Sequence, residues 1–235
     1  MKNILILALA TVAAASQAIV LHDNGSVVNG ANGSNPLSIL TPPETIFGFG
    51  VATAGATVNR MADNFTLANN STLNGIRLFS YQTGATAFTF TNVSWDIVSG
   101  DVNTGGVVAS GSAAPTNGGL VAYRVTNTTL TNTQRPIFAL DLNGLNVNLS
   151  GGQNYWLRWS ISGSLASGPW APPVQPVGTG NAQQSLSGGA FAPALDGTLS
   201  TEMPFVLSGT AVPEPATMVA LGAGALALIR RRRSK

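Results

Sequence analysis

The sequence predicts an all-β fold for the central part of the chain, in the form of an antiparallel β-sandwich of the jelly-roll kind. Between residues 45 and 210, apolar residues come in short runs that Gly, Asn, Ser and Pro interrupt, which is typical of strands joined by turns. No apolar stripe of helical period runs through this range. Five turn signals favour hairpins over a parallel sheet: Asn74-Gly75, Gly105-Gly106, Asn117-Gly118-Gly119, Asn143-Gly144 and Gly151-Gly152.

About nine strands are expected in this domain. They cover residues 46–51, 64–67, 73–81, 87–98, 107–110, 120–126, 136–142, 154–161 and 203–208. Residues 163–201, rich in Gly, Pro, Ser and Gln, are expected to form a long loop with room for one short strand. Residues 19–44, rich in Asn, Gly and Ser, are expected to be flexible. The length of 235 residues favours a single domain between the terminal segments.

The strand at 154–161 has the clearest alternation of side chains. The expected core face carries Tyr155, Leu157, Trp159 and Ile161. Trp156 then lies on the opposite face, either exposed or partly covered.

The strand at 87–98 changes phase along its length. Its apolar residues are Phe88 and Phe90 at one parity and Val93, Trp95 and Ile97 at the other. A bulge or break near Thr91 and Asn92 is therefore expected.

Residues 1–18 have the order of a secretory signal peptide. Lys2 gives a positive start, residues 4–15 are apolar, and residues 16–18 offer small side chains around a cleavage site after Ala18. Signal peptidase is therefore an expected partner, and the mature chain is expected to begin at Ile19.

Residues 212–235 combine three features in a fixed order. Pro213, Glu214 and Pro215 precede an almost wholly apolar segment, residues 216–229, which is expected to form a short membrane helix. The cluster that follows consists of Arg230, Arg231, Arg232 and Arg233. Such a cluster stays on the cytoplasmic side, which leaves the body of the chain outside the cytoplasm.

This tail resembles the PEP-CTERM sorting signal, a family whose tails are also labelled ice-binding protein C-terminal domain. The resemblance implies processing by exosortase, a membrane protease-transferase of Gram-negative bacteria that make exopolysaccharide. It also implies that Pro213, Glu214 and Pro215 are the recognition element and that the chain is held in the inner membrane only transiently. An ordinary membrane anchor remains the alternative. Residues 62–67, 154–157 and 204–210 more weakly resemble the β-sandwich regions that precede such tails.

Charge and cysteine content exclude several classes of protein. Between residues 19 and 212 the chain has five arginines, no lysine and eight acidic residues, a formal charge of −3. A nucleic-acid partner is not expected, because such proteins need a basic surface. With no cysteine in the sequence, disulfides and thiolate metal sites are excluded.

No catalytic residue, metal site or cofactor is predicted. His22 is the only histidine and lies in the segment expected to be flexible. The residues Asp101 to Gly106 follow part of a calcium-loop pattern, but Gly105 and Ser112 stand at two ligand positions, so a hairpin turn is expected. A secreted glycoside hydrolase is the less favoured alternative; its two carboxylates would come from Asp96, Asp101, Asp141, Asp196 and Glu202.

A saccharide-binding module is the stronger alternative. Sugars stack on aromatic rings while amides and hydroxyls bind their rims, and the candidate contacts are Trp170, Trp156 and Tyr81. The competing interpretation is that these aromatics close the sandwich and cover its loops. Thr126, Thr128, Thr129, Thr131 and Thr133 suggest an ice-binding array, but a solvent-facing strand edge is expected instead.

The leading expectation is an exported, non-enzymatic protein of the cell surface or extracellular matrix, with exopolysaccharide in a biofilm as a candidate partner.

Overall fold

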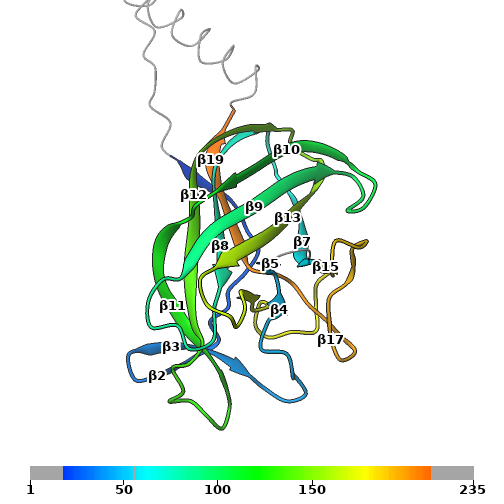
Figure 1. Ribbon diagram of the computed structural model, residues 1–235. Helices are drawn as coiled ribbons and strands as arrows, with labels where there is room; N and C mark the ends of the chain where they lie inside the picture. The colour runs from blue at the N-terminus through cyan, green and yellow to red at the C-terminus, as the bar shows by residue number, and fades with distance from the viewer. Residues whose placement is uncertain (1–17, 55–56, 213–235) are drawn as a thin grey trace, which may run out of the picture.

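Two curled sheets contain most of the strands of the computed structural model, which describes residues 18–54 and 57–212 (Figure 1). The seven-stranded sheet has the order β1 (Ile19–Asp23), β19 (Phe205–Ala211), β8 (Ser71–Ser80), β12 (Pro136–Leu149), β11 (Thr116–Thr126), β3 (Asn35–Leu40) and β2 (Gly30–Asn32). The six-stranded sheet has the order β10 (Gly106–Ala113), β9 (Phe90–Ser99), β13 (Asn154–Gly163), β7 (Arg60–Thr66), β15 (Gln183–Ser185) and β16 (Ala192–Pro193).

Three small two-stranded sheets complete the described structure. They pair β14 (Trp170–Ala171) with β4 (Phe49–Gly50), β17 (Leu195–Asp196) with β18 (Leu199–Ser200), and β5 (Thr53–Ala54) with β6 (Thr57–Val58). In the two large sheets, the described strands pair antiparallel except β3 with β11, which pair parallel. The described residues contain no helix, so the predicted all-β class is confirmed.

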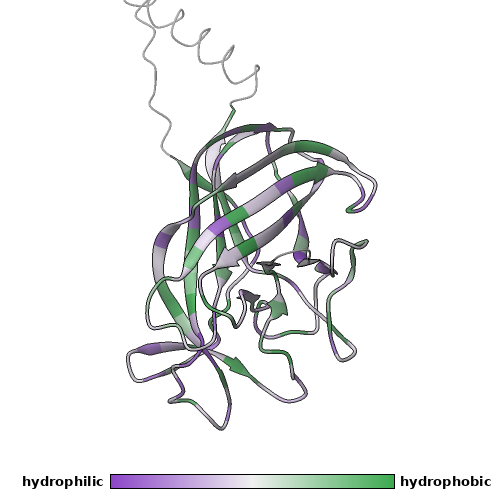
Figure 2. Ribbon diagram, viewed as in Figure 1, coloured by the Kyte–Doolittle hydropathy of each residue, from purple (hydrophilic) through white to green (hydrophobic). Residues whose placement is uncertain are grey.

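The main core lies between the two large sheets. It combines Leu73, Ile76 and Leu78 of β8, Leu140 of β12 and Phe205 and Leu207 of β19 with Met61 and Phe65 of β7 and residues of β9 and β13. Figure 2 shows hydrophobic and hydrophilic residues alternating along β9 and β13, as expected for strands with one face in a core. This arrangement is consistent with a β-sandwich; its jelly-roll connectivity stays a prediction.

The side-chain pattern of β13 was predicted correctly. All four residues of the expected core face, Tyr155, Leu157, Trp159 and Ile161, are buried in the main core. The bulge in β9 is also confirmed, because Ser162 pairs with Asn92 whereas Gly163 pairs with Phe90, which leaves Thr91 unpaired. The extra residue lets Phe90 and Val93 enter the same core despite their opposite parity.

The expectation of a flexible segment at residues 19–44 was wrong. This segment supplies β1, β2 and β3 to the seven-stranded sheet and buries Val27, Leu37 and Leu40. Its polar residues form turns and bridges: the Asn29 side chain donates to the Ile39 carbonyl and accepts from the Ile39 amide, at 2.9 and 2.7 Å. Polar composition therefore reflected edge strands and turns, not an absence of structure.

Residues 163–201 contain five short strands, β14 to β18, in place of the one expected. Ala171, Ala182 and Ala194 from this segment are buried in the main core. Small side chains allow the backbone to lie close against the sheets, so the segment is held although it has few large apolar residues.

Two of the expected turns, at Gly105-Gly106 and Gly151-Gly152, join β9 to β10 and β12 to β13. The three others lie inside strands β8, β11 and β12. At Gly75 a side chain would meet the Ser208 hydroxyl of the neighbouring β19 at 2.7 Å, so this glycine permits close strand approach and does not form a turn. The strand expected at 46–51 is reduced to the two residues of β4.

Candidate functional site

The three aromatic residues predicted to contact a saccharide do not form one surface. Tyr81 is 2% exposed and Trp156 is 8% exposed, so neither ring is available for stacking on a sugar. Trp156 packs on the outer side of the six-stranded sheet against Ala62, Val98 and Val102, with Phe191 beside them. The interpretation that these aromatics close the fold is correct for both residues.

Trp170 is half-buried and tied to neighbouring elements. Its amide donates to the Tyr81 carbonyl at 2.9 Å, and its carbonyl accepts from the Tyr81 amide at 3.0 Å. The Ser80 hydroxyl also donates to the Trp170 carbonyl, at 2.9 Å. Trp170 therefore joins β14 to the end of β8 and packs against the small cluster around Tyr81.

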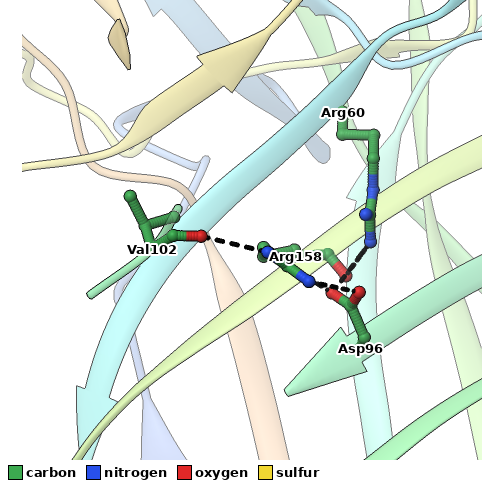
Figure 3. Close-up of polar contacts among 4 residues, drawn as sticks. All are labelled: Arg60, Asp96, Val102 and Arg158. Carbon is green, nitrogen blue, oxygen red and sulfur yellow. Dashed lines mark hydrogen bonds and ion pairs between the residues drawn. The ribbon is translucent and has the colours of Figure 1, made fainter. Parts of the chain in front are cut away.

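Asp96 is the centre of a charged group on the six-stranded sheet (Figure 3). The Arg158 guanidinium donates to both carboxylate oxygens at 2.7 Å, and Arg60 donates to Oδ1 at 2.8 Å. Arg158 also donates to the Val102 carbonyl at 3.0 Å. Burial raises the pKa of Asp96, but the two arginines outweigh it and hold that pKa below its usual value.

The other acidic residues considered for a hydrolase are separately occupied. Asp141 pairs with Arg77 at 2.6 Å. Asp196 accepts from the amides of Thr45 and Ile46, and Glu202 accepts from the Asn181 amide. These contacts hold strands and loops together.

Asp101 caps the turn between β9 and β10, as expected of a hairpin. Its Oδ1 accepts from the amides of Asn103 and Thr104, both at 2.9 Å. Among residues 18–54 and 57–212, no group of three or more His, Cys, Asp or Glu side chains could hold a metal ion. His22, expected in a flexible tail, lies in β1 beside the rings of Phe65 and Phe205.

Three of the threonines considered for an ice-binding array contact one another at the end of β11. The Thr126 hydroxyl lies 3.1 Å from that of Thr128 and 2.7 Å from that of Thr129. Thr126 ends β11, and the other four threonines lie in the connection between β11 and β12, not along a strand edge.

Asp63 is a buried carboxyl group that the sequence did not single out. It accepts from the amides of Asn64 at 2.7 Å and Met203 at 2.6 Å. Burial raises the pKa of Asp63 to about 8, with a further contribution from the charge of Glu202, while the two amides act in the opposite direction. Through Met203 it joins β7 to the chain leading into β19.

A cavity of about 560 Å³ was also missed. It lies between the segment 85–88 and strands β11 and β12, and its wall includes Phe88, Asn117, Leu120 and Tyr123. Leu120 pairs with Phe138 and Ala122 with Ile137, so β11 has a bulge between them. The bulge changes the phase of the strand, which is why Leu120 and Tyr123 reach one cavity despite their odd spacing.

The two ends of the described chain lie side by side. Strand β1 starts at Ile19, directly after the exposed Ala18, and Ile19 pairs with Gly209 of β19. At the other end the Val212 amide donates to the Asn70 carbonyl at 2.8 Å, so the fold is hydrogen-bonded up to the residue before Pro213. Both ends lie at the top of the molecule in the view of Figure 1, and this end of the body is called its pole below.

In sequence, residues 211–233 match the family model described as the PEP-CTERM protein-sorting motif. The chain carries a PEP-CTERM sorting motif. The match begins at Ala211, the last residue of β19, so the motif follows the folded body without an intervening linker. The motif supports export and sorting through exosortase. No curated protein matches the chain in sequence.

Most of the motif's predicted working parts lie outside the described residues. These are Pro213, Glu214 and Pro215, the apolar segment 216–229 and the four arginines from Arg230 to Arg233. The predicted signal segment before Ala18 also lies outside the described residues. In the part of the chain that the structure does describe, no helix is long and apolar enough to cross a membrane.

Proposed function

We propose that this chain is an exported, non-enzymatic protein of the cell surface or extracellular matrix, delivered through its PEP-CTERM motif and associated there with exopolysaccharide. The observation that carries the proposal is the position of the motif, which begins where the last strand of the folded body ends. Exosortase acts on the tail, signal peptidase acts after Ala18, and the inner membrane holds the chain only until both have acted.

The pairing of β1 with β19 supports this pathway. A signal peptide and a membrane tail in one precursor both enter the same bilayer, and their junctions with the body must therefore face it together. Ile19 and Val212 meet this requirement in the folded state. Ile19 pairs with Gly209, which lies only three residues before Val212, the last hydrogen-bonded residue of the body. The body can fold completely while both ends are still attached to the membrane.

The state of the acidic residues supports a non-enzymatic role. A glycosidase needs two carboxyl groups facing one cleft. Asp96 and Asp141 are engaged by arginines, and Asp196 is engaged by backbone amides, each in a different part of the fold. A secreted glycoside hydrolase remains the less favoured candidate.

The proposal is tested by replacing the recognition element. The double variant Pro213→Ala/Pro215→Ala removes both prolines of the expected recognition element, and with them the restriction that proline places on φ. We expect the variant to remain in the membrane fraction with its tail intact, while the wild-type chain leaves that fraction. Fractionated cells are probed with an antibody against the body and one against the C-terminal segment.

The control for this experiment is Pro193→Ala, which changes an exposed proline of β16 outside the motif. This variant should be processed as the wild type is. Normal processing of the double variant, or unchanged processing in a strain without exosortase, would refute the proposed pathway.

A further inference from the structure

We propose that the cavity between segment 85–88 and strands β11 and β12 is a binding site for a neutral saccharide. The inference deepens the proposed function, because it assigns the saccharide contact to a defined place on the exported body. It replaces the three aromatics that the sequence suggested, of which two are buried.

The cavity has the size of a small-ligand site. Its volume is about 560 Å³, inside the range of roughly 300–1,000 Å³ typical of such sites. One wall is the segment after β8 and the other is formed by β11 and the start of β12. The Gly84 amide donates to the Gln134 carbonyl at 2.7 Å, which fixes the two walls relative to each other.

Two aromatic rings, those of Phe88 and Tyr123, form part of the walls, and the Phe88 ring packs against other aromatic rings. Phe88 makes edge-to-face contacts with Phe90 and Phe138, with ring centroids 5.3 and 5.8 Å apart. Phe88 and Tyr123 are half-buried and both line the cavity, so part of each side chain is accessible. The apolar face of a pyranose ring packs on such surfaces, and a wall that is already ordered loses little entropy on binding.

Neutral polar groups complete the cavity. Thr86, Asn117, Thr133 and Tyr123 line it, and they bring three hydroxyl groups and one amide. Asn117 Oδ1 accepts from the Gly119 amide at 2.9 Å, which orients the side chain and leaves its NH₂ group to donate elsewhere. The hydroxyls of Thr86, Thr133 and Tyr123 make no hydrogen bond with other described residues. The same is true of the Asn117 NH₂ group. Sugar hydroxyls can donate to and accept from each of the three hydroxyls.

The charge of the walls selects among polar ligands. The lining contains no Asp, Glu, Lys, Arg or His side chain. The nearby Arg135 is directed to Phe47, with its guanidinium carbon 3.9 Å from the ring centroid. A uronate or phosphate group would lose its hydration without gaining a cation, so the site favours neutral sugars over charged ones.

The experiment measures binding of defined oligosaccharides to the full chain, purified from cells, by isothermal titration calorimetry. The neutral probes are hexasaccharides of α-1,4-, β-1,4- and β-1,3-linked glucose, and the charged probe is hexagalacturonate. We expect at least one neutral probe to bind and hexagalacturonate to bind at least tenfold more weakly. Thr133→Val and Asn117→Asp should each weaken the neutral probe about fivefold or more, because each removes a hydrogen-bonding group in a side chain of similar shape.

Matched controls are available on the same elements. Thr131→Val changes an exposed threonine in the same turn as Thr133, and Asn146→Asp changes an exposed asparagine of β12; neither residue lines the cavity. Both should bind as the wild type does. The inference is overturned if no neutral probe binds, if hexagalacturonate binds equally well, or if the cavity variants keep the wild-type affinity. Failure of sorting would be seen in the fractionation experiment and would leave these affinities unchanged, so the two proposals fail separately.

Discussion

Asp96 shows how this weakly charged body uses its few ionic groups. Two arginines from neighbouring strands converge on one carboxylate that is mostly shielded from water. Arg60 and Arg158 also lie over the ring of Phe191, at 6.0 and 5.7 Å from its centroid. The group thus connects β7, β9 and β13 with the loop that covers the outer face of the sheet.

The change Asp96→Asn should therefore destabilise the fold. It leaves two shielded cations without a counter-charge, and we expect the free energy of unfolding to fall by about 2–3 kcal/mol. Urea denaturation followed by tryptophan fluorescence measures this change. Asp141→Asn is the control, because its partner Arg77 has a side chain 47% exposed and such pairs contribute less than about 1 kcal/mol. Equal losses in the two variants would contradict this account of Asp96.

Asp63 gives stability an unusual dependence on pH. The folded state holds its proton up to about pH 8, whereas an unfolded chain releases it near the ordinary value of 3.8. The contribution of Asp63 to stability is therefore complete below about pH 4 and decreases as the pH rises toward 8. We predict that the unfolding free energy of the wild type, minus that of Asp63→Asn, decreases as the pH rises from 4.5 to 7.5. Denaturant titrations across that range test it, and a difference that is constant or rises with pH would refute it.

At the scale of elements, β19 depends on close contact with β8. An added Cβ at Gly209 would collide with the Thr72 carbonyl oxygen of β8 and lie 2.8 Å from the Leu21 side chain of β1. Gly209→Ala should therefore loosen the last strand and lower the free energy of unfolding by about 1–3 kcal/mol.

The control for this prediction is Gly106→Ala in β10, where the nearest atom to an added Cβ is the Ser99 hydroxyl at 3.8 Å. That variant should be close to wild type when both are unfolded in urea. If Gly209→Ala is equally stable, then β19 does not pack as closely as described.

The features predicted correctly from the sequence are those that depend on residues close together in the chain. The four core residues of β13 alternate strictly, and the phase change between Phe90 and Val93 revealed the bulge. Prediction from the sequence failed where tertiary contacts override local preference. Asn74-Gly75 reads as a turn but lies in the middle of β8, and residues 19–44 read as flexible but join the sheet by edge pairing.

The cavity could not be predicted for the same reason. Its wall joins Phe88 to Leu120 and Tyr123, which come together only through pairing of β11 with β12 and a bulge in β11. The burial of Trp156 is also a tertiary effect, since a loop more than thirty residues later brings Phe191 over it. By contrast, the sorting motif is a linear feature and was recognised from its order alone.

Over the whole chain, the distribution of charge separates the folded body from the two terminal segments. Every lysine and four of the nine arginines lie before residue 19 or after residue 212, and the body between carries a formal charge of −3. The fold brings the two junctions to one pole, where Ile19 and Val20 are exposed by 50% and 62%. In the proposed function, the cavity between segment 85–88 and strands β11 and β12 is the part of the body that contacts material outside the cell.

The intact mass of the mature protein, purified from the surface or matrix of the producing cell, tests the central claim most directly. We predict a mature chain that begins at Ile19 and has lost the segment with Arg230 to Arg233 and Lys235. A mature protein that still ends at Lys235 would contradict sorting by removal of the tail.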